Sequence, residues 1–398
     1  MKTIWFFCNS EPNFLDGKNI KLRRHGQLIN YLSKRNIRII WWSSNFSHFH
    51  KKVRNKKDIL IKVKKNIYIM NTKSISYKTN ISIRRYLNTL FAGLSMKKYF
   101  YTLKKPDLII LSVPPVDSAA SFVNFAKKNK IPLISDFRDM WPDIINHNLN
   151  WFLKIFFYPF YLYMYLNLLK IRNNSNYIVS VSNGMLKWIK NKSNKIIPSS
   201  VIYLYHNIPK IKNKKVYNII YFYYAGVIST SNYMQKFLKY FDNLPSKLKQ
   251  KIKINISGYG DVYNNLSSNS KRENVKFLGW LDQKEIAWFS NKSHYGLVTY
   301  KNRFDFKRNI PNKISEYLGY GMPVLTTLKG ESFNIMKFYS TCIYINLKNQ
   351  KSFENSMLKI IKNKNYRKMS QNSRKLFLKK FDSKKNLENY FKIIKRFI

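Results

Sequence analysis

The chain of 398 residues is poor in acidic residues, with 19 Asp and Glu against 73 Lys and Arg, and its formal net charge is +54. Such a charge ordinarily suggests nucleic acid or an anionic membrane surface as a partner. The basic residues are scattered through every segment instead of forming one arm, however, and this weakens the nucleic-acid interpretation. We therefore expect an anionic membrane surface as a partner and no nucleic acid.

Cysteine is almost absent. Cys8 and Cys342 lie far apart in the sequence, which excludes a disulfide framework and a cysteine-based zinc site and fits a reducing cytosol. The apolar run at residues 4–8 is too short for a signal-peptide core, so we expect a first strand there. His48 and His50 form the only close histidine pair. They lie in a polar basic segment with no third ligand nearby, and we predict that they face solvent without a metal.

Several catalytic motifs are also absent. The sequence has no Gly-x-Ser-x-Gly elbow, no Walker loop, no Cys-His nucleophile pattern and no Asp-x-Asp pair. Hydrolase and NTPase interpretations are therefore poor. Without an acidic pair to hold a metal, a diphosphate ligand must be neutralised by cations and helix dipoles. We expect neither a metal nor a cofactor.

The pattern that is present is an alternation of short apolar runs and helical segments. It predicts an α/β fold with parallel sheets wrapped by helices, and the length predicts two domains. The predicted strands are residues 4–8, 37–42, 67–70, 108–112, 133–136 and 177–181 in the first half, and 219–225, 252–257, 275–278, 295–298, 324–327 and 343–345 in the second.

The segments between these runs set the predicted domain boundaries. Residues 205–217 are rich in Lys and Asn and form the best inter-domain linker. The spacing of apolar residues predicts an amphipathic helix at the C-terminal end. We predict domains at residues 1–207 and 208–380, followed by a C-terminal helix at 381–398. Residues 51–65 hold eight basic residues and one acid, and we expect an exposed basic loop there.

The most informative stretch is residues 311–327, PNKISEYLGYGMPVLTT. Pro311 favours a helix start, and the glycines that follow favour a tight turn before a buried strand. Lys313 and Glu316 share one face near the helix N-terminus, where unpaired amides can bind an anion. The alternative is an ordinary surface helix with an ion pair between these two side chains.

This stretch resembles the donor-nucleotide motif of GT-B glycosyltransferases, specifically of glycosyltransferase family 4, in which Pro-x-Lys-x-x-Glu-Tyr precedes Gly-x-Pro-Val. Five further stretches match in family order, so the resemblance covers most of the chain. They are RRHGQLINYL, SSNFSH, DFRDMWPD, VSNGM and FLGWL.

The resemblance implies two Rossmann-like parallel-sheet domains facing a cleft, with the C-terminal helix crossing back to the N-terminal domain. It implies a retaining, metal-independent transfer of a sugar from a nucleoside diphosphate to a lipid-linked or saccharide acceptor in the synthesis of surface polysaccharide such as O-antigen or capsule. Two alternatives remain. One is a nucleotide-sugar epimerase of the same fold, and the other is a non-enzymatic basic protein that binds nucleic acid or membrane.

The donor-binding residues are predicted from strand ends and from the motif. Glycines after two strands let a backbone approach a nucleotide, although glycine there is commonly only a turn. Resemblance assigns Glu316 to the ribose, and the cations before the helix suit a diphosphate. Relatives carry a first glutamate where this chain has Arg308, which suits phosphate instead. The predicted set is Gly226, Gly258, Gly260, Arg303, Arg308, Asn312, Lys313 and Glu316.

The first domain supplies the other predicted site residues. Resemblance places Asp16, Gly17 and Arg24 on the acceptor side, with a solvated helix position as the alternative for Arg24. Arg138 and Asp139 follow the strand at 133–136, where open α/β sheets place ligands, and with Lys313 they are the predicted catalytic residues. The alternative is a pair of Arg138 with Asp139 or Asp143 that only pins the loop. Many relatives have His where this chain has Arg138.

Residues 151–171 are unusually aromatic. No charge occurs at residues 155–169, which span about 22 Å as a helix, short of the roughly 30 Å hydrocarbon core of a bilayer. Pro159 is expected to interrupt the hydrogen-bond ladder of this helix. Tyr and Trp rings favour the head-group boundary, so we expect a cytoplasmic protein, peripheral on the inner face of the cytoplasmic membrane. The alternative is that this helix packs on the sheet.

Overall fold

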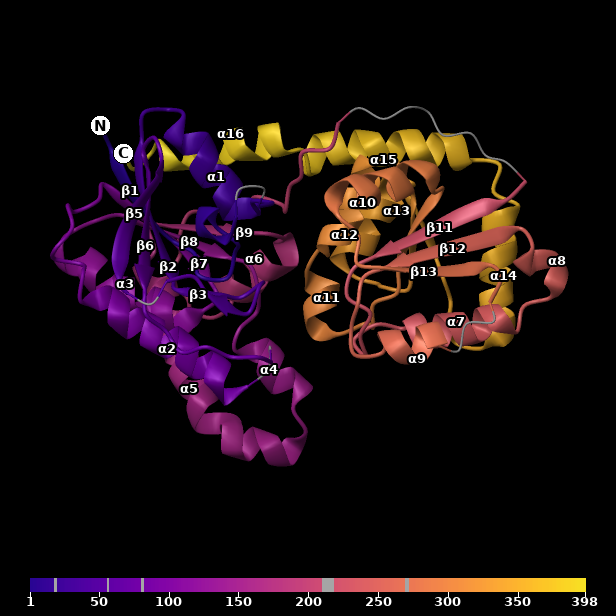
Figure 1. Cartoon of the computed structure of the whole chain (residues 1–398), viewed down its shortest axis with the longest axis horizontal. Coiled ribbons are helices and arrows are strands. Elements are labelled where there is room, and N and C mark those ends of the chain that lie inside the picture. The colour runs from indigo at the N-terminus through magenta and orange to yellow at the C-terminus, as the bar shows by residue number, and fades with distance from the viewer. Residues whose placement is uncertain (18–19, 56, 80–81, 210–217, 269–271) are drawn as a thin grey trace. The chain divides into compact units, whose positions relative to one another are not determined.

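The computed structural model describes residues 1–17, 20–55, 57–79, 82–209, 218–268 and 272–398, which form two compact units. Unit 1 comprises Met1–Ile202 and Leu387–Ile398, and unit 2 comprises Tyr203–Asn386. Each unit is a mainly parallel sheet covered by helices (Figure 1). The division falls a few residues from the predicted boundaries at 207 and 380. Residues 210–217 of the predicted linker lie outside the described residues.

The sheet of unit 1 has eight strands in the order β10-β9-β8-β7-β1-β2-β6-β5. All neighbours are parallel except β5 and β6, which are antiparallel. The central strands are buried along their whole length, because helices cover both faces. The strands are β1 (Thr3–Phe7), β2 (Arg38–Ser44), β5 (Ile59–Lys64), β6 (Ile67–Thr72), β7 (Leu108–Val113), β8 (Leu133–Phe137), β9 (Tyr177–Ser180) and β10 (Ser199–Val201), with a separate pair of β3 (Phe46–Ser47) and β4 (Lys52–Val53).

The helices of unit 1 include one from the far end of the chain. The hydroxyl of Tyr390 on this last helix donates to the buried carboxylate of Asp136 at 3.1 Å, which confirms that the C-terminal helix returns to the first domain. The helices are α1 (Arg24–Ser33), α2 (Ile83–Lys97), α3 (Val116–Lys128), α4 (Asp143–Asn148), α5 (Trp151–Asn174), α6 (Asn183–Lys190) and α16 (Ser383–Ile394), with a 3-10 turn η1 (Phe14–Asp16).

The basic segment at 51–65 is not simply a loop. It contains β4 and β5, and Ile61 of β5 faces Ile69 of β6 in an antiparallel pair. The charge count hid the alternation of apolar and basic residues that a half-exposed strand requires. β5 is an edge strand, and its lysines keep that edge from pairing with another chain.

The sheet of unit 2 has six parallel strands in the order β13-β12-β11-β14-β15-β16. Strand order therefore reverses between β11 and β14, and in unit 1 it reverses in the same way between β1 and β7. Open α/β sheets bind ligands at the carboxyl ends of strands at such a switch point. The strands are β11 (Ile220–Ala225), β12 (Ile252–Ser257), β13 (Val275–Gly279), β14 (Tyr295–Val298), β15 (Val324–Thr326) and β16 (Cys342–Tyr344).

The helices of unit 2 cover both faces of this sheet (Figure 1). One apolar cluster packs the first strands against α7 and α14, and a second packs α12 and α15 against β14 and β15. The helices are α7 (Met234–Asp242), α8 (Ser246–Lys249), α9 (Tyr263–Ser268), α10 (Gln283–Lys292), α11 (Phe304–Arg308), α12 (Asn312–Gly319), α13 (Glu331–Phe338), α14 (Gln350–Ile361) and α15 (Tyr366–Lys380).

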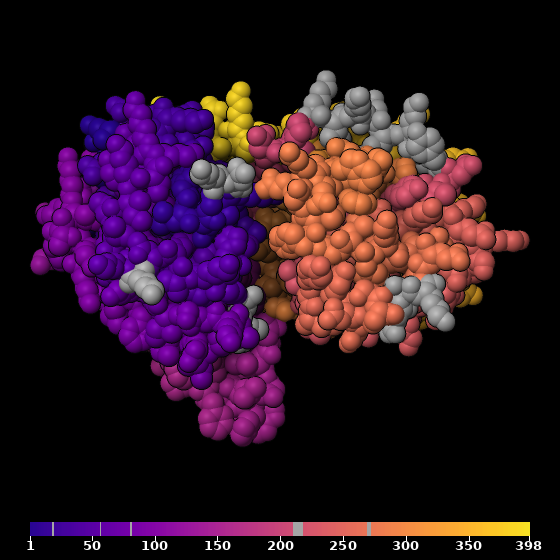
Figure 2. Space-filling view, viewed as in Figure 1, coloured from indigo at the N-terminus to yellow at the C-terminus, as the bar shows by residue number. Residues whose placement is uncertain are grey.

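Helix α5 continues through Pro159, which supplies no N–H to the hydrogen-bond ladder of the helix but does not end it. The C-terminal part of α5 packs on unit 1 through Met164, Leu168 and Ile171. Its N-terminal part forms much of the lobe that projects from unit 1, drawn in magenta at the bottom of Figure 2. By length and composition α5 is the one helix, among the described residues, that could cross a membrane, and 11% of its most apolar window is buried.

Candidate active site

The switch point of unit 2 is built by the ends of β11 and β14 and the start of α12. Tyr224 and Gly226 stand at the end of β11, and Tyr300 follows β14. The amine of Lys313 lies 3.7 Å from the ring centre of Tyr224 and 5.0 Å from that of Tyr300. Three segments distant in sequence thus meet at one ammonium group.

Lys313 is buried, with 7% of its surface exposed, so the alternative of an ordinary surface ion pair is wrong. Burial lowers its pKa to about 7, and the charge of Glu316 opposes this shift only in part. Among the described residues Nζ has no hydrogen bond or ion pair, only the two aromatic faces. A cation held in this way is available to a ligand anion.

Gly226 keeps the approach to this amine open. Its φ is +136°, and a Cβ there would lie 3.2 Å from the Lys313 Nζ. A side chain at this position would both strain the backbone and crowd the ammonium group. The glycine predicted from its place after a strand is therefore needed here for a physical reason.

The motif helix is held against the sheet by Tyr317. Its hydroxyl accepts a hydrogen bond from the Ala225 amide at 2.8 Å. Its ring lies so close to β14 that a Cβ on Gly296 would approach it to 2.2 Å. Gly296 therefore sets the position of α12, and with it that of Lys313. The predicted order of helix, turn and buried strand over 311–327 is confirmed.

Glu316 faces a histidine that the sequence did not single out. His206 Nδ1 lies 3.4 Å from the Glu316 carboxylate, and His206 Nε2 lies 3.0 Å from the Ser315 hydroxyl. The Glu316 side chain keeps 28% of its surface exposed. One edge of the carboxylate is thus oriented by His206. Its ribose role stays a prediction.

The other two predicted glycines pack backbone against backbone. A Cβ on Gly258 would lie 2.1 Å from the Gly226 carbonyl oxygen, and one on Gly260 would lie 2.0 Å from that of Ile228. These glycines let the loops after β11 and β12 touch each other. Backbone packing alone therefore explains why glycine is required at both positions. Their role in donor binding stays a prediction.

The cations before α12 already make contacts of their own. Arg303 pairs with Asp305 at 3.1 Å. The guanidinium of Arg308 lies 4.0 Å from the ring centre of Phe304, and it also donates to the carbonyl of that residue. Asn312 accepts from Ser315 through its backbone carbonyl at 2.8 Å. The structure thus gives Lys313 the central place in the predicted cluster, and donor roles for Arg303, Arg308 and Asn312 stay predictions.

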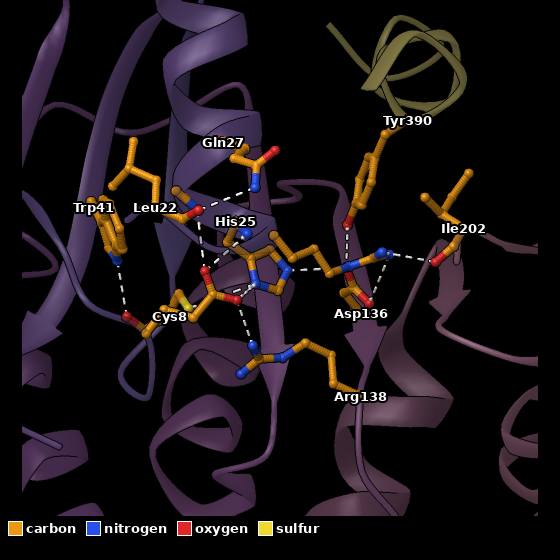
Figure 3. Close-up of polar contacts among 12 residues, drawn as sticks. Cys8, Leu22, His25, Gln27, Trp41, Asp136, Arg138, Ile202 and Tyr390 are labelled. Atoms are coloured by element: carbon orange, nitrogen blue, oxygen red, sulfur yellow. Dashed lines mark hydrogen bonds and ion pairs between the residues drawn. The ribbon is translucent and has the colours of Figure 1, made fainter. Parts of the chain in front are cut away.

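Unit 1 holds a buried ionic network at the carboxyl end of β8 (Figure 3). The carboxylate of Asp136 accepts from Arg24 at 2.8 Å, contacts His25 Nε2 at 3.0 Å and accepts from Tyr390. Glu11 accepts from Arg138 at 2.6 Å and lies 3.2 Å from His25 Nδ1. His25 thus bridges two carboxylates.

The network fixes the protonation states of its members. Burial alone would raise the pKa of Glu11, but the charges of His25 and Arg138 lower it to about 2. Burial opposes the charge on His25, yet attraction to Cys8 and Glu11 and the bond to Asp136 hold its pKa well above its usual value. Because each ring nitrogen of His25 lies beside a carboxylate, the network favours the protonated imidazolium form.

Cys8, Glu11 and His25 could by distance alone hold a metal ion, since their ligand atoms lie within 4.8 Å of one another. A protonated imidazole has no lone pair for a metal, and Arg138 already occupies the Glu11 carboxylate. The donor set therefore fits an internal salt-bridge network better than a metal site.

The network corrects two interpretations of the sequence. Arg24 is 4% exposed and donates to Asp136 and the Ile202 carbonyl, so its alternative as a solvated helix residue is wrong. Arg138 pairs with Glu11, not with Asp139 or Asp143. The short spacing in DFRDMWPD favoured a local pair, whereas Glu11 lies in the loop after β1, which is separated from β8 in the sheet by β7.

The remaining predicted residues of unit 1 have structural contacts. Asp16 forms a two-fold ion pair with Arg54, at 2.8 and 2.6 Å, beside Gly17 with its φ of +138°. Asp139 accepts from the Met140 amide, and Asp143 pairs with Lys192. Acceptor-side roles for Asp16, Gly17 and Arg24, and catalytic roles for Arg138 and Asp139, stay predictions.

Sequence reasoning missed several residues that the structure brings together. Glu11, His25 and Asp136 all lie in quoted stretches or next to a strand end, but nothing local indicates that they share one network. Tyr224 and Tyr300 could have been found, because each lies at or just past the end of a strand that flanks the switch point.

Comparisons with known proteins agree with this arrangement. Residues 233–380 match the family model of the glucosyltransferase 3-like C-terminal domain. The fold is GT-B. Sucrose-phosphate synthase from Thermosynechococcus elongatus superimposes with a TM-score of 0.73 and 11% identity over 100% of this chain and 99% of that one. Most of unit 2 is thus similar to a glycosyltransferase domain, and the chain has the GT-B fold.

Two further GT-B structures cover 100% of this chain and of their own. HepE from Anabaena, in complex with UDP, gives a TM-score of 0.67 with 12% identity. The lipopolysaccharide outer core galactosyltransferase WaaB gives a TM-score of 0.64 with 12% identity. No characterised protein matches the chain significantly by sequence.

Proposed function

We propose that the protein is a retaining, metal-independent glycosyltransferase of family 4 type that moves a sugar from a nucleoside diphosphate to a lipid-linked or saccharide acceptor in surface-polysaccharide synthesis. The observation that carries this proposal is the buried Lys313 ammonium at the switch point of unit 2, in a glycosyltransferase domain. The UDP in HepE and the substrate class of WaaB support the donor and acceptor classes.

In this proposal Lys313 takes the charge of the departing diphosphate. The amine is desolvated and fixed between Tyr224 and Tyr300, so its interaction with an anion is stronger than it would be in water. The first amides of α12 and the positive end of its dipole add to this. Glu316 would hold the ribose hydroxyls. The departing phosphate would help to deprotonate the acceptor on the same face, so no protein nucleophile is required.

The test is a transfer assay with purified protein, a panel of nucleotide sugars and lipid-extract acceptors. We expect transfer to continue in EDTA, with product of unchanged anomeric configuration by NMR. Strict dependence on added magnesium or manganese would refute the metal-independent part. Conversion of the nucleotide sugar without any acceptor would identify an epimerase instead.

We also propose that unit 1 docks on the inner face of the cytoplasmic membrane through α5. The observation behind this is the exposure of Trp151 (74%), Phe156 (65%) and Ile155 (62%) in one projecting helix. Residues 151–163 precede the part that packs on unit 1 and span about 20 Å as a helix. This is too short for the roughly 30 Å core of a bilayer, so α5 would lie at the head-group boundary.

Flotation with liposomes tests the docking. Binding should need anionic lipid, weaken in high salt and fall when Trp151, Phe152 and Phe156 are changed to Ser together. Tyr161 is a poor choice for this test, because its hydroxyl donates to Asp143 at 3.1 Å. Phe338→Ser is the matched control, since Phe338 is 82% exposed in unit 2. If the wild type stays unbound on anionic vesicles at low salt, the membrane proposal is wrong.

A further inference from the structure

Unit 1 has a pocket at its own switch point that none of its predicted acceptor-side or catalytic residues lines. Asn9 follows β1, Ser44 ends β2 and Pro114 follows β7, and these three line its floor. The first turns of α2 cover it with Arg85 and Asn88. The free space is about 20 Å³, enough for one water-sized group, so a sugar ring does not fit.

The mouth of this pocket is cationic and aromatic. The Arg85 guanidinium lies 5.1 Å from the ring centre of Trp141. His48 Nδ1 lies 2.5 Å from the Tyr77 hydroxyl, and the Lys51 amine lies 4.5 Å from the Tyr77 ring centre. The prediction that His48 faces solvent is therefore wrong, because His48 lines the pocket against Tyr77.

The electrostatic effect of these groups appears at His48. Its pKa is lowered to about 4 by burial first, and then by the charges of Arg85, Lys51 and Arg23, all of which are cationic. The same pair of causes, burial and Arg85, lowers the pKa of Lys51. The pocket mouth thus has a positive potential that disfavours further protonation and favours an anion.

An apolar surface begins beside this mouth. Tyr86 follows Arg85 on α2, and its ring contacts Phe160 of α5 with centres 5.7 Å apart. From Phe160 the exposed aromatic side chains of α5 continue to Trp151. A ligand with an anionic head in the pocket could therefore lay an apolar chain along α5 without leaving unit 1.

We propose that this pocket binds the phosphoryl group of a lipid phosphate, whose hydrocarbon chain lies along α5. Arg85 provides the two-pronged contact with the phosphoryl oxygens, and one oxygen enters the space between Asn9 and Asn88. The inference rests on the proposed function and narrows it, because it selects a lipid-linked acceptor over a free saccharide.

The probe is dodecyl phosphate, with inorganic phosphate and dodecyl maltoside as comparisons, measured by titration calorimetry below the micellar concentration. We expect dodecyl phosphate to bind at least tenfold more tightly than either comparison, because each comparison lacks the head or the chain. If inorganic phosphate binds as tightly, the pocket is a free-phosphate site and the lipid assignment is overturned.

Arg85→Gln should weaken dodecyl phosphate binding at least tenfold, and Arg85→Lys should restore part of it. The control is Arg84→Gln, because Arg84 is the neighbouring residue on α2 and is exposed. The affinity of this variant for dodecyl phosphate should stay within twofold of the wild-type value. Equal affinity of Arg85→Gln and wild type would overturn the proposal. Melting temperatures of all three variants check folding.

UDP binding separates this proposal from the proposed function. Arg85→Gln should bind UDP as the wild type does, because Arg85 lies in unit 1 and Lys313 in unit 2. If the wild type binds dodecyl phosphate through Arg85 but binds no nucleoside diphosphate, the pocket stands and the glycosyltransferase proposal falls. If the wild type binds UDP but does not bind dodecyl phosphate through Arg85, the donor site stands and the lipid phosphate proposal is overturned.

Discussion

The switch points of the two units are alike in topology but differ in how the buried charges beside them are paired. In unit 2 a single buried ammonium, that of Lys313, lies between two tyrosine rings. In unit 1 the buried charges beside the switch point satisfy one another, with Asp136 accepting from Arg24 and Glu11 from Arg138. Burial alone therefore does not identify a binding residue. The charges of unit 1 form ion pairs within the fold, whereas the Lys313 amine contacts two aromatic rings and has no ion pair among the described residues.

The largest expected effect is on the paired side of this comparison. Asp136→Asn should destabilise unit 1 by about 3–5 kcal/mol, because it leaves the buried guanidinium of Arg24 without its counter-charge. Unfolding in urea, followed by the fluorescence of Trp5 and Trp41 in the core of unit 1, measures this. Asp107→Asn is the control. Its carboxylate pairs with the exposed Lys2, and the change should cost less than about 1 kcal/mol. Equal midpoints for the two variants would show that the network does not stabilise unit 1.

On the unpaired side, Lys313→Met should leave folding intact and reduce affinity for UDP. A charge-assisted hydrogen bond contributes about 1.5–3 kcal/mol, which corresponds to roughly ten- to hundredfold in affinity. The matched control is Lys292→Met, because the Lys292 amine also lies over an aromatic ring, 3.8 Å from the ring centre of Trp288, but on an exposed helix position. Unchanged UDP affinity in Lys313→Met would remove the central residue of the proposed donor site.

A smaller effect is expected at the neighbouring carboxylate. Glu316→Gln keeps the shape of the side chain but removes the charge that strengthens its bonds to ribose hydroxyls, so UDP affinity should fall about tenfold. Glu273→Gln, an exposed position of unit 2, should change nothing. A comparison of UDP with inorganic diphosphate locates the effect, since only the nucleotide carries a ribose. An equal loss for both ligands would argue against the ribose role.

The smallest expected effect is the uptake of part of a proton by Lys313 when UDP binds. Burial lowers the pKa of Lys313 to about 7, with Glu316, Tyr224 and Tyr300 around it. A bound diphosphate stabilises the ammonium and raises this pKa. Binding of UDP should therefore take up part of a proton at pH 8 and almost none at pH 6, where Lys313 is already charged. Calorimetry in two buffers of different ionisation enthalpy measures the uptake, and Lys313→Met should abolish it. An uptake that persists in this variant would assign the proton to another group.

The lowered pKa of Lys313 also makes the free energy of unfolding depend on pH. The folded-state pKa of Lys313 lies below its unfolded value of about 10.5, so the unfolded chain holds the proton more tightly. The free energy of unfolding should therefore increase as the pH rises from about 7 towards 10.5, as far as this group is concerned.

The fold was largely predictable because its signals are local. Short apolar runs marked the strands, and the glycines and prolines of 311–327 marked the helix, turn and strand that carry Lys313. The local pattern failed at β5, where basic residues concealed a strand.

The site was predictable only in part, because partners across a sheet are not visible in a sequence. Lys313 was found from its motif, but the two rings that hold it come from β11 and from the loop after β14. Arg138 was paired with the nearest acids in sequence, whereas its partner is Glu11, more than a hundred residues away. The pocket beside Arg85 was not predicted, since its residues come from six separate segments, and the quoted stretches SSNFSH and DFRDMWPD supply only part of its lining.

The segments that enter and leave unit 2 are joined to each other. The His206 amide donates to the Phe381 carbonyl at 3.0 Å, and the Ser383 amide donates to the His206 carbonyl at 3.1 Å. Unit 2 is an insertion in the chain of unit 1. Its entering and leaving segments are held together by these two backbone hydrogen bonds. The ring of His206 also contacts Glu316 and Ser315, so the paired segments that enter and leave unit 2 are linked directly to the motif helix.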